Sequence, residues 1–405
     1  MKPIVRAGRM KPVHSDIRGP LFVEAMKRQK QGIDILKLNT GNPATFGFGL
    51  PDSIKNALIE HMQDGVGYCD FKGMPQARQA ICDYETSKGI KGITSDDVFI
   101  GNGVSEVVSF ALTPLLNDGD EVLVPSPSYS LWGNSVYLED GKPVFYTCDE
   151  QANWYPDIQD IRSKITDKTK AIVIINPNNP TGVLYPKELL LEIIQIARES
   201  GLLIFADEIY DRLVMDGKQH ISLASLTEDV PVITLNGLSK SHCLCGYRCG
   251  WMVISGPREL TEDYRQGIIQ LTSLRLCANT LAQIVIPVAL DDMETPASMV
   301  RPGGRIYEQR EATVRELEKI DGLSFVKNDA AFYVFPKLDV KKFNITNDKQ
   351  FAHDLLDVTN ILLVPGSGFD WKDPDHFRIV MLPQADILSD AIRRMGTFLD
   401  GYKQK

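Results

Sequence analysis

Residues 171–207 read AIVIINPNNPTGVLYPKELLLEIIQIARESGLLIFAD. An apolar run, AIVII, is followed by a loop rich in Asn and Pro, a helix-length segment (187–200) and a second apolar run, LLIFA. Short apolar runs of this kind predict strands that are buried on both faces. Strand, helix and strand in this order predict two parallel strands joined by a crossover helix.

The same alternation extends from about Asp97 to Ser255. We therefore expect an α/β fold, a three-layer sandwich around a mostly parallel sheet. After about Pro296 the strands shorten (LSFV, AFYVFP, ILLVPG, FRIVML) and alternate with helices expected at 348–358 and 385–399, which predicts a smaller α+β domain. The predicted strands of the large domain are VFIGNG, EVLVPSP, PVFYTC, AIVIINP, LLIFADE, VITLNG and WMVIS. The expected units are an N-terminal segment packing with the small domain (1–49), the large domain (50–295) and the small domain (296–405), with the boundary in a helix near 293–310.

The bulk composition disfavours several classes of function. A chain of 405 residues exceeds the roughly 250 to 300 at which single cores stop growing. A net charge of -9, with Lys and Arg scattered along the chain, argues against a nucleic-acid partner. No apolar run approaches the roughly 20 residues of a membrane span, and the N-terminus lacks the apolar core of a signal peptide. We expect a cytoplasmic protein without a membrane partner.

Seven cysteines, an odd number, make a disulfide framework improbable in such a chain. Cys243, Cys245 and Cys249 cluster, but their spacing matches no familiar zinc pattern. We therefore interpret them as packing thiols and expect no metal site.

Lys240 follows the predicted strand VITLN in NGLSKSHCLCGYRCGW, and Arg248 comes eight residues later. A lysine buried at a strand end beside cationic groups loses some preference for its charged form. It then becomes a nucleophile for a carbonyl carbon, as a Schiff base requires. Taken alone, a surface lysine after a strand is the simpler interpretation.

Two further motifs end predicted strands, where open α/β sheets place ligands. Asp207 could pair with the protonated ring nitrogen of a pyridoxal cofactor, and Tyr210 could hydrogen-bond its ring hydroxyl. The alternative interpretation of Asp207 is an acidic residue that caps the next helix. The loop NPNNPTG is rich in turn formers, which predicts a rigid, specially shaped backbone. Asn179 could present its amide to a ring oxygen or a substrate carboxylate, and its bond to Pro180 is a candidate for the cis form.

The fourth motif, VFIGNGVSEVVSFAL, runs from a strand through glycines into a helix expected to begin at Val104 or Ser105. Free N–H groups at such a helix start receive phosphate. Glu106 replaces the third glycine of the dinucleotide fingerprint, so a dinucleotide is disfavoured. A single phosphate, such as that of pyridoxal phosphate, fits better.

In this order the four motifs resemble those of the fold-type-I aminotransferases, the aspartate aminotransferase superfamily, over nearly the whole chain. Within it the sequence is similar to bacterial alanine (glutamate–pyruvate) aminotransferases, in LNTGNPATFGF, GYCDFKG, NPNNPTG, FADEIYD, NGLSK and FRIVMLP. The resemblance implies amino transfer between L-alanine and 2-oxoglutarate by a ping-pong cycle on pyridoxal 5'-phosphate. Valine, aromatic amino acids or aspartate remain alternative amino donors, and a lyase or decarboxylase that uses the same cofactor is an alternative activity. A ligand-sensing module of a transcription factor is a further alternative, but it would need a DNA-binding domain, and no helix-turn-helix pattern is found before the large domain.

The resemblance also implies cofactor-binding residues. Lys240 would carry the cofactor as a Schiff base and shuttle the proton, Asp207 would pair with the ring nitrogen, and Asn179 and Tyr210 would hold the ring hydroxyl. Tyr129 would stack on the ring. The phosphate would lie among Gly103, Val104, Ser105, Ser239, Arg248 and, from the other subunit, Tyr68, which implies a homodimer with sites at its interface.

For the substrate, the resemblance implies that Arg378 binds the α-carboxylate in a bidentate fork, near the backbone of Gly41 and the side chain of Asn179. Arg378 and the cofactor lie on different predicted domains, so domain closure on substrate is a hypothesis. In aspartate aminotransferase a second arginine binds the side-chain carboxylate of the substrate, and Arg275 lies near that region of the sequence. A purely structural role for Arg275 is the alternative. Ser15 and Arg18 belong to a segment that could face the entrance, without a derivable role.

Overall fold

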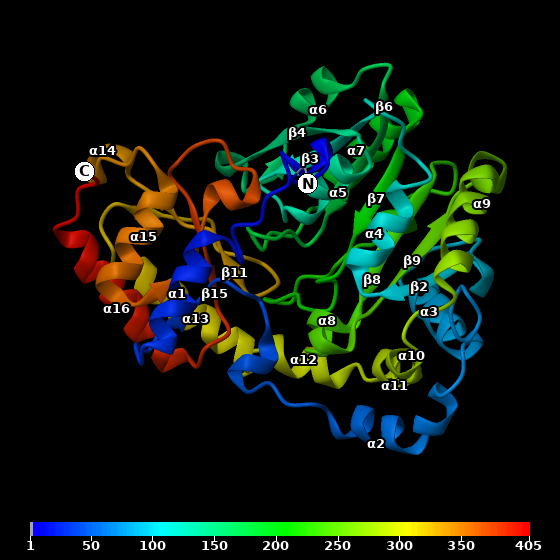
Figure 1. Cartoon of the computed structure of the whole chain (residues 1–405), viewed down its shortest axis with the longest axis horizontal. Coiled ribbons are helices and arrows are strands. Elements are labelled where there is room, and N and C mark those ends of the chain that lie inside the picture. The colour runs from blue at the N-terminus through cyan, green and yellow to red at the C-terminus, as the bar shows by residue number, and fades with distance from the viewer. Residues whose placement is uncertain (1–2) are drawn as a thin grey trace.

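A twisted eight-stranded sheet forms the centre of the larger of two lobes in the computed structural model, which describes residues 3–405 (Figure 1). Most neighbouring strands are parallel, but β9 runs antiparallel to both its neighbours and β5 is antiparallel to β4. The predicted mostly parallel α/β sheet is therefore confirmed. The strands, in spatial order, are β2 (Val98–Asn102), β9 (Cys249–Ser255), β8 (Val232–Gly237), β7 (Leu203–Asp207), β6 (Thr169–Ile175), β3 (Glu121–Ser126), β4 (Lys142–Asp149) and β5 (Tyr155–Pro156).

Helices cover both faces of this sheet, which is why its strands are apolar on both sides. In β6, Ile172 and Ile174 belong to the core beneath α7, whereas Val173 and Ile175 belong to the core beneath α4. Helix α4 begins at Val104, as predicted, and ends at Leu112, two residues before Pro114. The helices of the large lobe are α2 (Asp52–Glu60), α3 (Pro75–Ser87), α4 (Val104–Leu112), α5 (Leu131–Leu138), α6 (Ile158–Lys164), α7 (Lys187–Ser200), α8 (Leu238–Ser241), α9 (Arg258–Arg275), α10 (Thr280–Ile284) and α11 (Ile286–Asp291).

The smaller lobe has short strands and longer helices. A three-stranded antiparallel sheet in the order β11–β15–β14 holds its centre. The apolar face of α16, with Leu388, Ile392 and Met395, packs on that centre. The elements are α13 (Arg305–Leu317), β10 (Leu323–Ser324), β11 (Tyr333–Val334), β12 (Lys337–Leu338), α14 (Val340–Phe343), α15 (Asp348–Thr359), β13 (Ile361–Leu362), β14 (Val364–Pro365), β15 (Phe377–Val380) and α16 (Ala385–Asp400).

The chain passes between the lobes through two helices, α12 (Glu294–Val300) and α13, rather than the single helix expected there. A turn with Pro302 and Gly303, the latter at φ 82°, separates them because neither residue favours the helix interior.

The N-terminal segment spans both lobes, which corrects the expectation that residues 1–49 pack with the small one. Helix α1 (Pro20–Lys30) packs on α15, and β1 (Leu36–Lys37) pairs with β13. The preceding turn, η1 (Gly8–Met10), instead lies on α5 of the large lobe, where the N-terminus is seen in Figure 1. Backbone N–H of His14 donates to Asn134 there at 3.1 Å.

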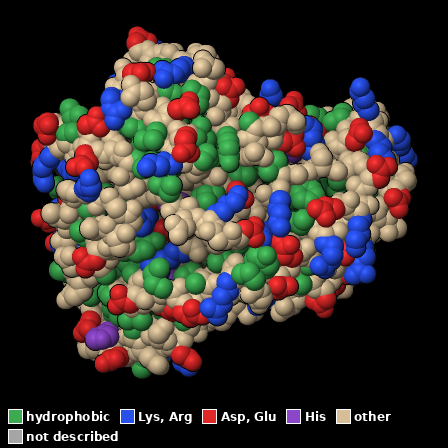
Figure 2. Space-filling model, turned by 180° about the vertical axis from the view of Figure 1, so that it is seen from behind, with side chains coloured by type: hydrophobic (Ala, Val, Ile, Leu, Met, Phe, Trp, Pro, Cys, Tyr) green, Lys and Arg blue, Asp and Glu red, His purple; other side chains and the backbone are tan. Residues whose placement is uncertain are grey.

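Charges of both signs are interspersed over the face shown in Figure 2. Residues 3–405 contain no helix with the length and apolar character that crossing a bilayer requires. All seven cysteines are free thiols, and burial raises the pKa of Cys243 and of Cys249 to about 12. A thiol that is so hard to ionise packs as an apolar group.

Candidate functional site

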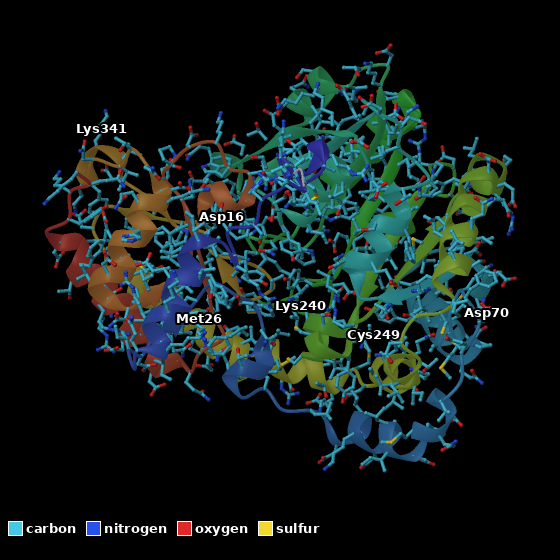
Figure 3. All side chains as sticks on the ribbon, viewed as in Figure 1. Asp16, Met26, Asp70, Lys240, Cys249 and Lys341 are labelled. Carbon is cyan, nitrogen blue, oxygen red and sulfur yellow. The ribbon has the colours of Figure 1, made fainter. Side chains whose placement is uncertain are left out.

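Lys240 lies between the two lobes, on the short helix α8 that follows β8 (Figure 3). The turn at Gly237 packs so closely on β9 that a Cβ there would lie 2.6 Å from the carbonyl oxygen of Cys249. Lys240 Nζ donates a hydrogen bond to the carbonyl oxygen of Gly41 at 3.0 Å and lies 4.0 Å from Cys245 Sγ. Two predicted site residues, Lys240 and Gly41, are therefore in direct contact.

The pKa of Lys240 differs from the expectation. Burial and Arg378 lower it, as the sequence argument assumed, but the hydroxyl of Tyr333 and the thiol of Cys245 act in the opposite direction. The pKa of Lys240 therefore stands above its usual value, and the amine is an ammonium in the free chain. The expected loss of charge preference was wrong because these neighbours were not foreseen.

Asp207 is the last residue of β7, and its carboxylate is buried at the carboxyl ends of the parallel strands. Trp132 Nε1 donates to Asp207 Oδ2 at 3.0 Å, and the backbone N–H of Ile209 approaches Oδ1 at 3.4 Å. Burial raises the pKa of Asp207 from its usual 3.8 to about 6, although both hydrogen bonds oppose the rise. The carboxylate is thus incompletely compensated, and a cationic group would stabilise its charged form.

This raised pKa predicts how the free chain responds to pH. The unfolded carboxyl ionises near 3.8 while the folded one holds its proton to about 6. The folded state therefore loses stability as pH rises from about 4 to about 6, by about 3 kcal/mol, and the cost remains above that range. We expect the cofactor-free Asp207→Asn variant to be more stable than the cofactor-free parent at pH 7.5 but not at pH 4, as measured by urea unfolding. An equal difference at both pH values would refute the assignment.

The predicted phosphate-binding turn is assembled around Gly103. Its φ of 85° favours glycine, and a Cβ there would lie 2.2 Å from Arg248 Nη2, so the arginine side chain reaches directly over this residue. The next residues, Val104 and Ser105, begin α4, where the first backbone N–H groups lack helical partners. Ser239 adjoins Lys240. The turn offers backbone donors, hydroxyls and one guanidinium to an anion.

Tyr210 and Tyr129 also lie in this region. The hydroxyl of Tyr210 is 2.8 Å from that of Tyr333, and burial raises the pKa of Tyr210 well above its usual value. Tyr129 lies close enough to affect the pKa of both Lys240 and Arg378. Tyr68, by contrast, is 84% exposed, and Asp70, two residues on, lies at the edge of the molecule far from Lys240 in Figure 3.

Arg378 on β15 reaches the same region from the small lobe. Its side chain is fully buried, with Nη1 donating to Asn179 Oδ1 at 2.9 Å and Nη2 to the carbonyl oxygen of Asn39. Nε has no hydrogen-bond partner among the described residues. Burial lowers the pKa of Arg378. A buried guanidinium without a carboxylate partner is unusual, and an anionic ligand would balance its charge.

Asn179 meets Arg378 as predicted, but the loop differs in one respect. The cis bond is Asn176–Pro177 at the start of the loop, not the bond to Pro180. The hydrogen bonds from Thr181 to Asn178 Oδ1 and from the N–H of Tyr185 to Asn176 Oδ1 hold the loop.

Arg275, Arg18 and Ser15, for which the sequence predicts no definite role, lie in different surroundings. Arg275 forms an ion pair with Glu106 and donates to the carbonyl oxygens of Phe71 and Ile100, both at 3.2 Å, so its contacts are structural. Arg18 lines a hollow of about 440 Å³ that also includes Asn39 and Thr40, next to Gly41. Ser15 is exposed.

Lys88 is a largely buried residue that sequence reasoning missed. Its Nζ lies 2.8 Å from Glu85 Oε2, 2.7 Å from Glu208 Oε2 and 3.1 Å from Asp211 Oδ2. Glu208 directly follows Asp207, and Asp211 accepts a hydrogen bond at 2.7 Å from Asn236, the residue before Gly237. Burial raises the pKa of Glu85, which reduces the charge that Lys88 must balance. The lysine thus supports two of the turns that form the site.

We expect Lys88→Met to destabilise the fold by about 3–5 kcal/mol, because it leaves buried carboxylates without a cation. Adding Glu85→Gln should recover part of that loss by removing one of them. Urea unfolding of the two variants measures both effects. Lys91→Met, which removes an exposed pair with Glu228, is the control. A loss in Lys88→Met no larger than in this control would contradict the prediction.

Comparison with known proteins identifies the family of the chain. Residues 33–392 match the family model described as aminotransferase class I and II. The chain is 50% identical to the glutamate-pyruvate aminotransferase AlaA of Haemophilus influenzae, and the match covers 100% of each chain. It is 45% identical to the alanine aminotransferase of Mycobacterium tuberculosis, over 100% of this chain and 94% of the relative.

Solved structures agree as well. An aminotransferase from Escherichia coli superposes with a TM-score of 0.98 at 47% identity, over 100% of both chains. An alanine aminotransferase from Pyrococcus furiosus gives a TM-score of 0.93 at 40% identity, over 98% of this chain and 100% of that one. On this evidence the chain belongs to the class I and II aminotransferases.

Proposed function

We propose that the chain is a pyridoxal-phosphate-dependent transaminase that moves an amino group between L-alanine and 2-oxoglutarate, giving pyruvate and L-glutamate. The full-length relatives named for this reaction support the choice of substrate. The observation that carries the proposal is that Lys240 lies within electrostatic range of two incompletely compensated buried charges. These are the carboxylate of Asp207 on the large lobe and the guanidinium of Arg378 on the small one.

The residues present fit pyridoxal phosphate. When bound, the cofactor supplies an electron sink for the charge left when Cα loses its proton. Asp207 would pair with its ring nitrogen, because a cation there would stabilise the charged form of this buried carboxylate. Tyr210 and Asn179 would hold the ring hydroxyl, with Tyr129 against the ring face. The phosphate would lie among Gly103, Val104, Ser105, Ser239 and Arg248.

Arg378 would bind the α-carboxylate of either substrate. Asn179 and Asn39 each accept one N–H, from Nη1 and Nη2, so the N–H of Nε and the second N–H of each Nη are the donors that could form a fork with a ligand. Lys240 Nζ would hold and move the proton at Cα of the substrate. Its bond to Gly41 places this amine beside the segment proposed to meet the substrate.

We further propose a homodimer in which the partner's Tyr68 completes the phosphate site. In its own chain Tyr68 is exposed, and large apolar side chains are exposed nearby in sequence, at the end of α9 and on the helix α10 that packs on this region. Thr280 joins the two segments by donating to the carbonyl oxygen of Gly65 at 2.8 Å. Exposed apolar patches of this kind mark contact surfaces. The exposed side chains are Ile59, Met62, Val66, Leu274, Leu276 and Leu281.

Mixed dimers test the shared site. A dimer of one Tyr68→Ala chain and one Lys240→Ala chain contains one site with both native residues if Tyr68 crosses the interface. Such a hybrid should recover near half of the parental activity, whereas each variant alone is impaired. A hybrid no more active than the mean of the two variants would show that Tyr68 serves its own chain.

Half-reactions test the substrate. Each amino acid is mixed with the cofactor-loaded enzyme, and the loss of the cofactor's visible absorbance is followed by stopped flow. Alanine and glutamate should convert the cofactor fastest and yield their oxo acids in stoichiometric amounts, ahead of valine, aspartate and aromatic amino acids. A panel with alanine among the slowest would overturn the substrate, and continuous product release without an oxo-acid acceptor would indicate a lyase.

A further inference from the structure

We infer that Tyr333 is a positioning residue of this site, which orients the hydroxyl of Tyr210 and the guanidinium of Arg378 at the same time. The inference rests on the proposed function. Tyr333 lies on β11 of the small lobe, in a predicted strand that carried no candidate site residue, and only 2% of it is exposed. Its contacts separate into those of the hydroxyl and those of the ring.

The hydroxyl of Tyr333 forms its bond across the lobes. Tyr333 Oη and Tyr210 Oη are 2.8 Å apart, and the rings meet edge to face with centroids 5.7 Å apart. Only one of two bonded hydroxyls can donate. If Tyr210 donates to the ring oxygen of the cofactor, Tyr333 must therefore donate to Tyr210. A hydroxyl that accepts a hydrogen bond becomes a stronger donor, so Tyr333 strengthens the bond that Tyr210 makes.

The ring of Tyr333 holds Arg378. Arg378 Cζ lies 4.5 Å from the centroid of Tyr333 and 4.6 Å from that of Phe369. These two rings fix the position of the guanidinium, while Asn179 and Asn39 hold two of its nitrogens. The ring contact therefore contributes to the binding of a carboxylate.

The backbone of Tyr333 is itself held in place. Tyr333 pairs with Val380 in the β11–β15 ladder, two residues from Arg378. A Cβ at Gly182, in the Asn- and Pro-rich loop, would lie 3.0 Å from the carbonyl oxygen of Tyr333. A Cβ at Gly41 would lie 2.2 Å from Tyr333 Oη, so this position in the N-terminal segment leaves space for the hydroxyl. Tyr333 thus touches the large lobe, the small lobe and the N-terminal segment.

The hydroxyl is tested by Tyr333→Phe, read by pH titration of the visible absorbance of the cofactor-loaded enzyme. Weakening the bond from Tyr210 leaves the ring oxygen less stabilised as an anion, so the cofactor–lysine linkage keeps its proton longer. We expect the titration midpoint to rise by roughly 0.5–1 pH unit, with KM for alanine changed less than about twofold. In a Tyr210→Phe background the same substitution should shift the midpoint no further.

Tyr264→Phe is the matched control. Tyr264 is a partly buried tyrosine whose hydroxyl donates to the carbonyl oxygen of Ala111 at 2.6 Å, near the end of α4 that is remote from the Gly103 turn. It should lose stability like Tyr333→Phe but leave the midpoint unchanged. An unchanged midpoint in Tyr333→Phe, an equal shift in Tyr264→Phe, or a shift that persists without Tyr210 would each overturn the inference.

The ring is tested by Tyr333→Leu and, independently, by Phe369→Leu. Each should raise KM for alanine and 2-oxoglutarate by about tenfold, and Phe369→Leu should leave the absorbance midpoint in place. If Tyr333→Leu does not fold, Phe369→Leu still decides whether the aromatic sandwich positions Arg378, since an unchanged KM contradicts it. A parent enzyme that shows no cofactor absorbance would instead reject the proposed function, so the two failures are distinguishable.

Discussion

Lys240→Ala is expected to fold and yet lose alanine–2-oxoglutarate transamination by about 10⁴-fold or more. The variant loses both the amine that attaches the cofactor and the group that moves the proton at Cα. In the free chain this amine donates to the carbonyl oxygen of Gly41 and, at 4.0 Å, weakly to Cys245 Sγ, so its removal costs only about 1–2 kcal/mol of stability. Steady-state turnover measures the loss of activity, the visible absorbance measures attachment of the cofactor, and urea unfolding measures stability.

Lys91→Ala is the control for Lys240→Ala, because it removes an exposed lysine whose only ion pair is with exposed Glu228 among the described residues. It should keep parental activity and absorbance. A small primary amine added to Lys240→Ala should restore part of the turnover if the missing function is proton transfer. Turnover near the parental rate in Lys240→Ala would remove the lysine from the mechanism.

Arg378→Lys is expected to raise KM for both alanine and 2-oxoglutarate by about 10²–10³-fold, with a smaller change in kcat. Truncating one partner of a buried charge pair costs about 3–5 kcal/mol, and a lysine cannot reproduce the planar fork of a guanidinium. The nitrogens fixed by Asn179 and Asn39 would also lose their geometry. Steady-state kinetics with each substrate varied in turn gives the two KM values.

Arg310→Lys is the matched control for Arg378→Lys. Arg310 is also a fully buried arginine, but both its Nη atoms lie 2.7 Å from the carboxylate of Asp216, so its partner is internal. Its substitution should lower stability and leave both KM values unchanged. Unchanged KM values in Arg378→Lys, or equal increases in both variants, would exclude Arg378 as the carboxylate-binding residue.

Much of the fold and the outline of the site could be predicted because they depend on local patterns. Apolar runs without alternation predict strands covered on both faces, and β6, β7 and β8 lie where these runs occur. Polar residues directly after such runs must lie at the carboxyl ends of the strands, which is why the sequence alone groups Asp207, Asn179 and Lys240.

Contacts between distant segments could not be predicted in this way. Tyr333 lies in an ordinary apolar strand, and its bond to Tyr210 spans 123 positions of the sequence. Lys88 follows α3 like a solvated helix end, yet two carboxylates from the loop after β7 enclose it. The path of the N-terminal segment over both lobes likewise depends on single contacts, such as His14 with Asn134, that carry no periodic signal.

The most direct test of the central claim is to reduce the cofactor-loaded enzyme with borohydride and to map the modified peptide by mass spectrometry. Reduction makes the linkage between cofactor and lysine permanent. We predict a single adduct, on the peptide that contains Lys240. An adduct on a different lysine, or none on protein that absorbs at the cofactor's visible band, would contradict it.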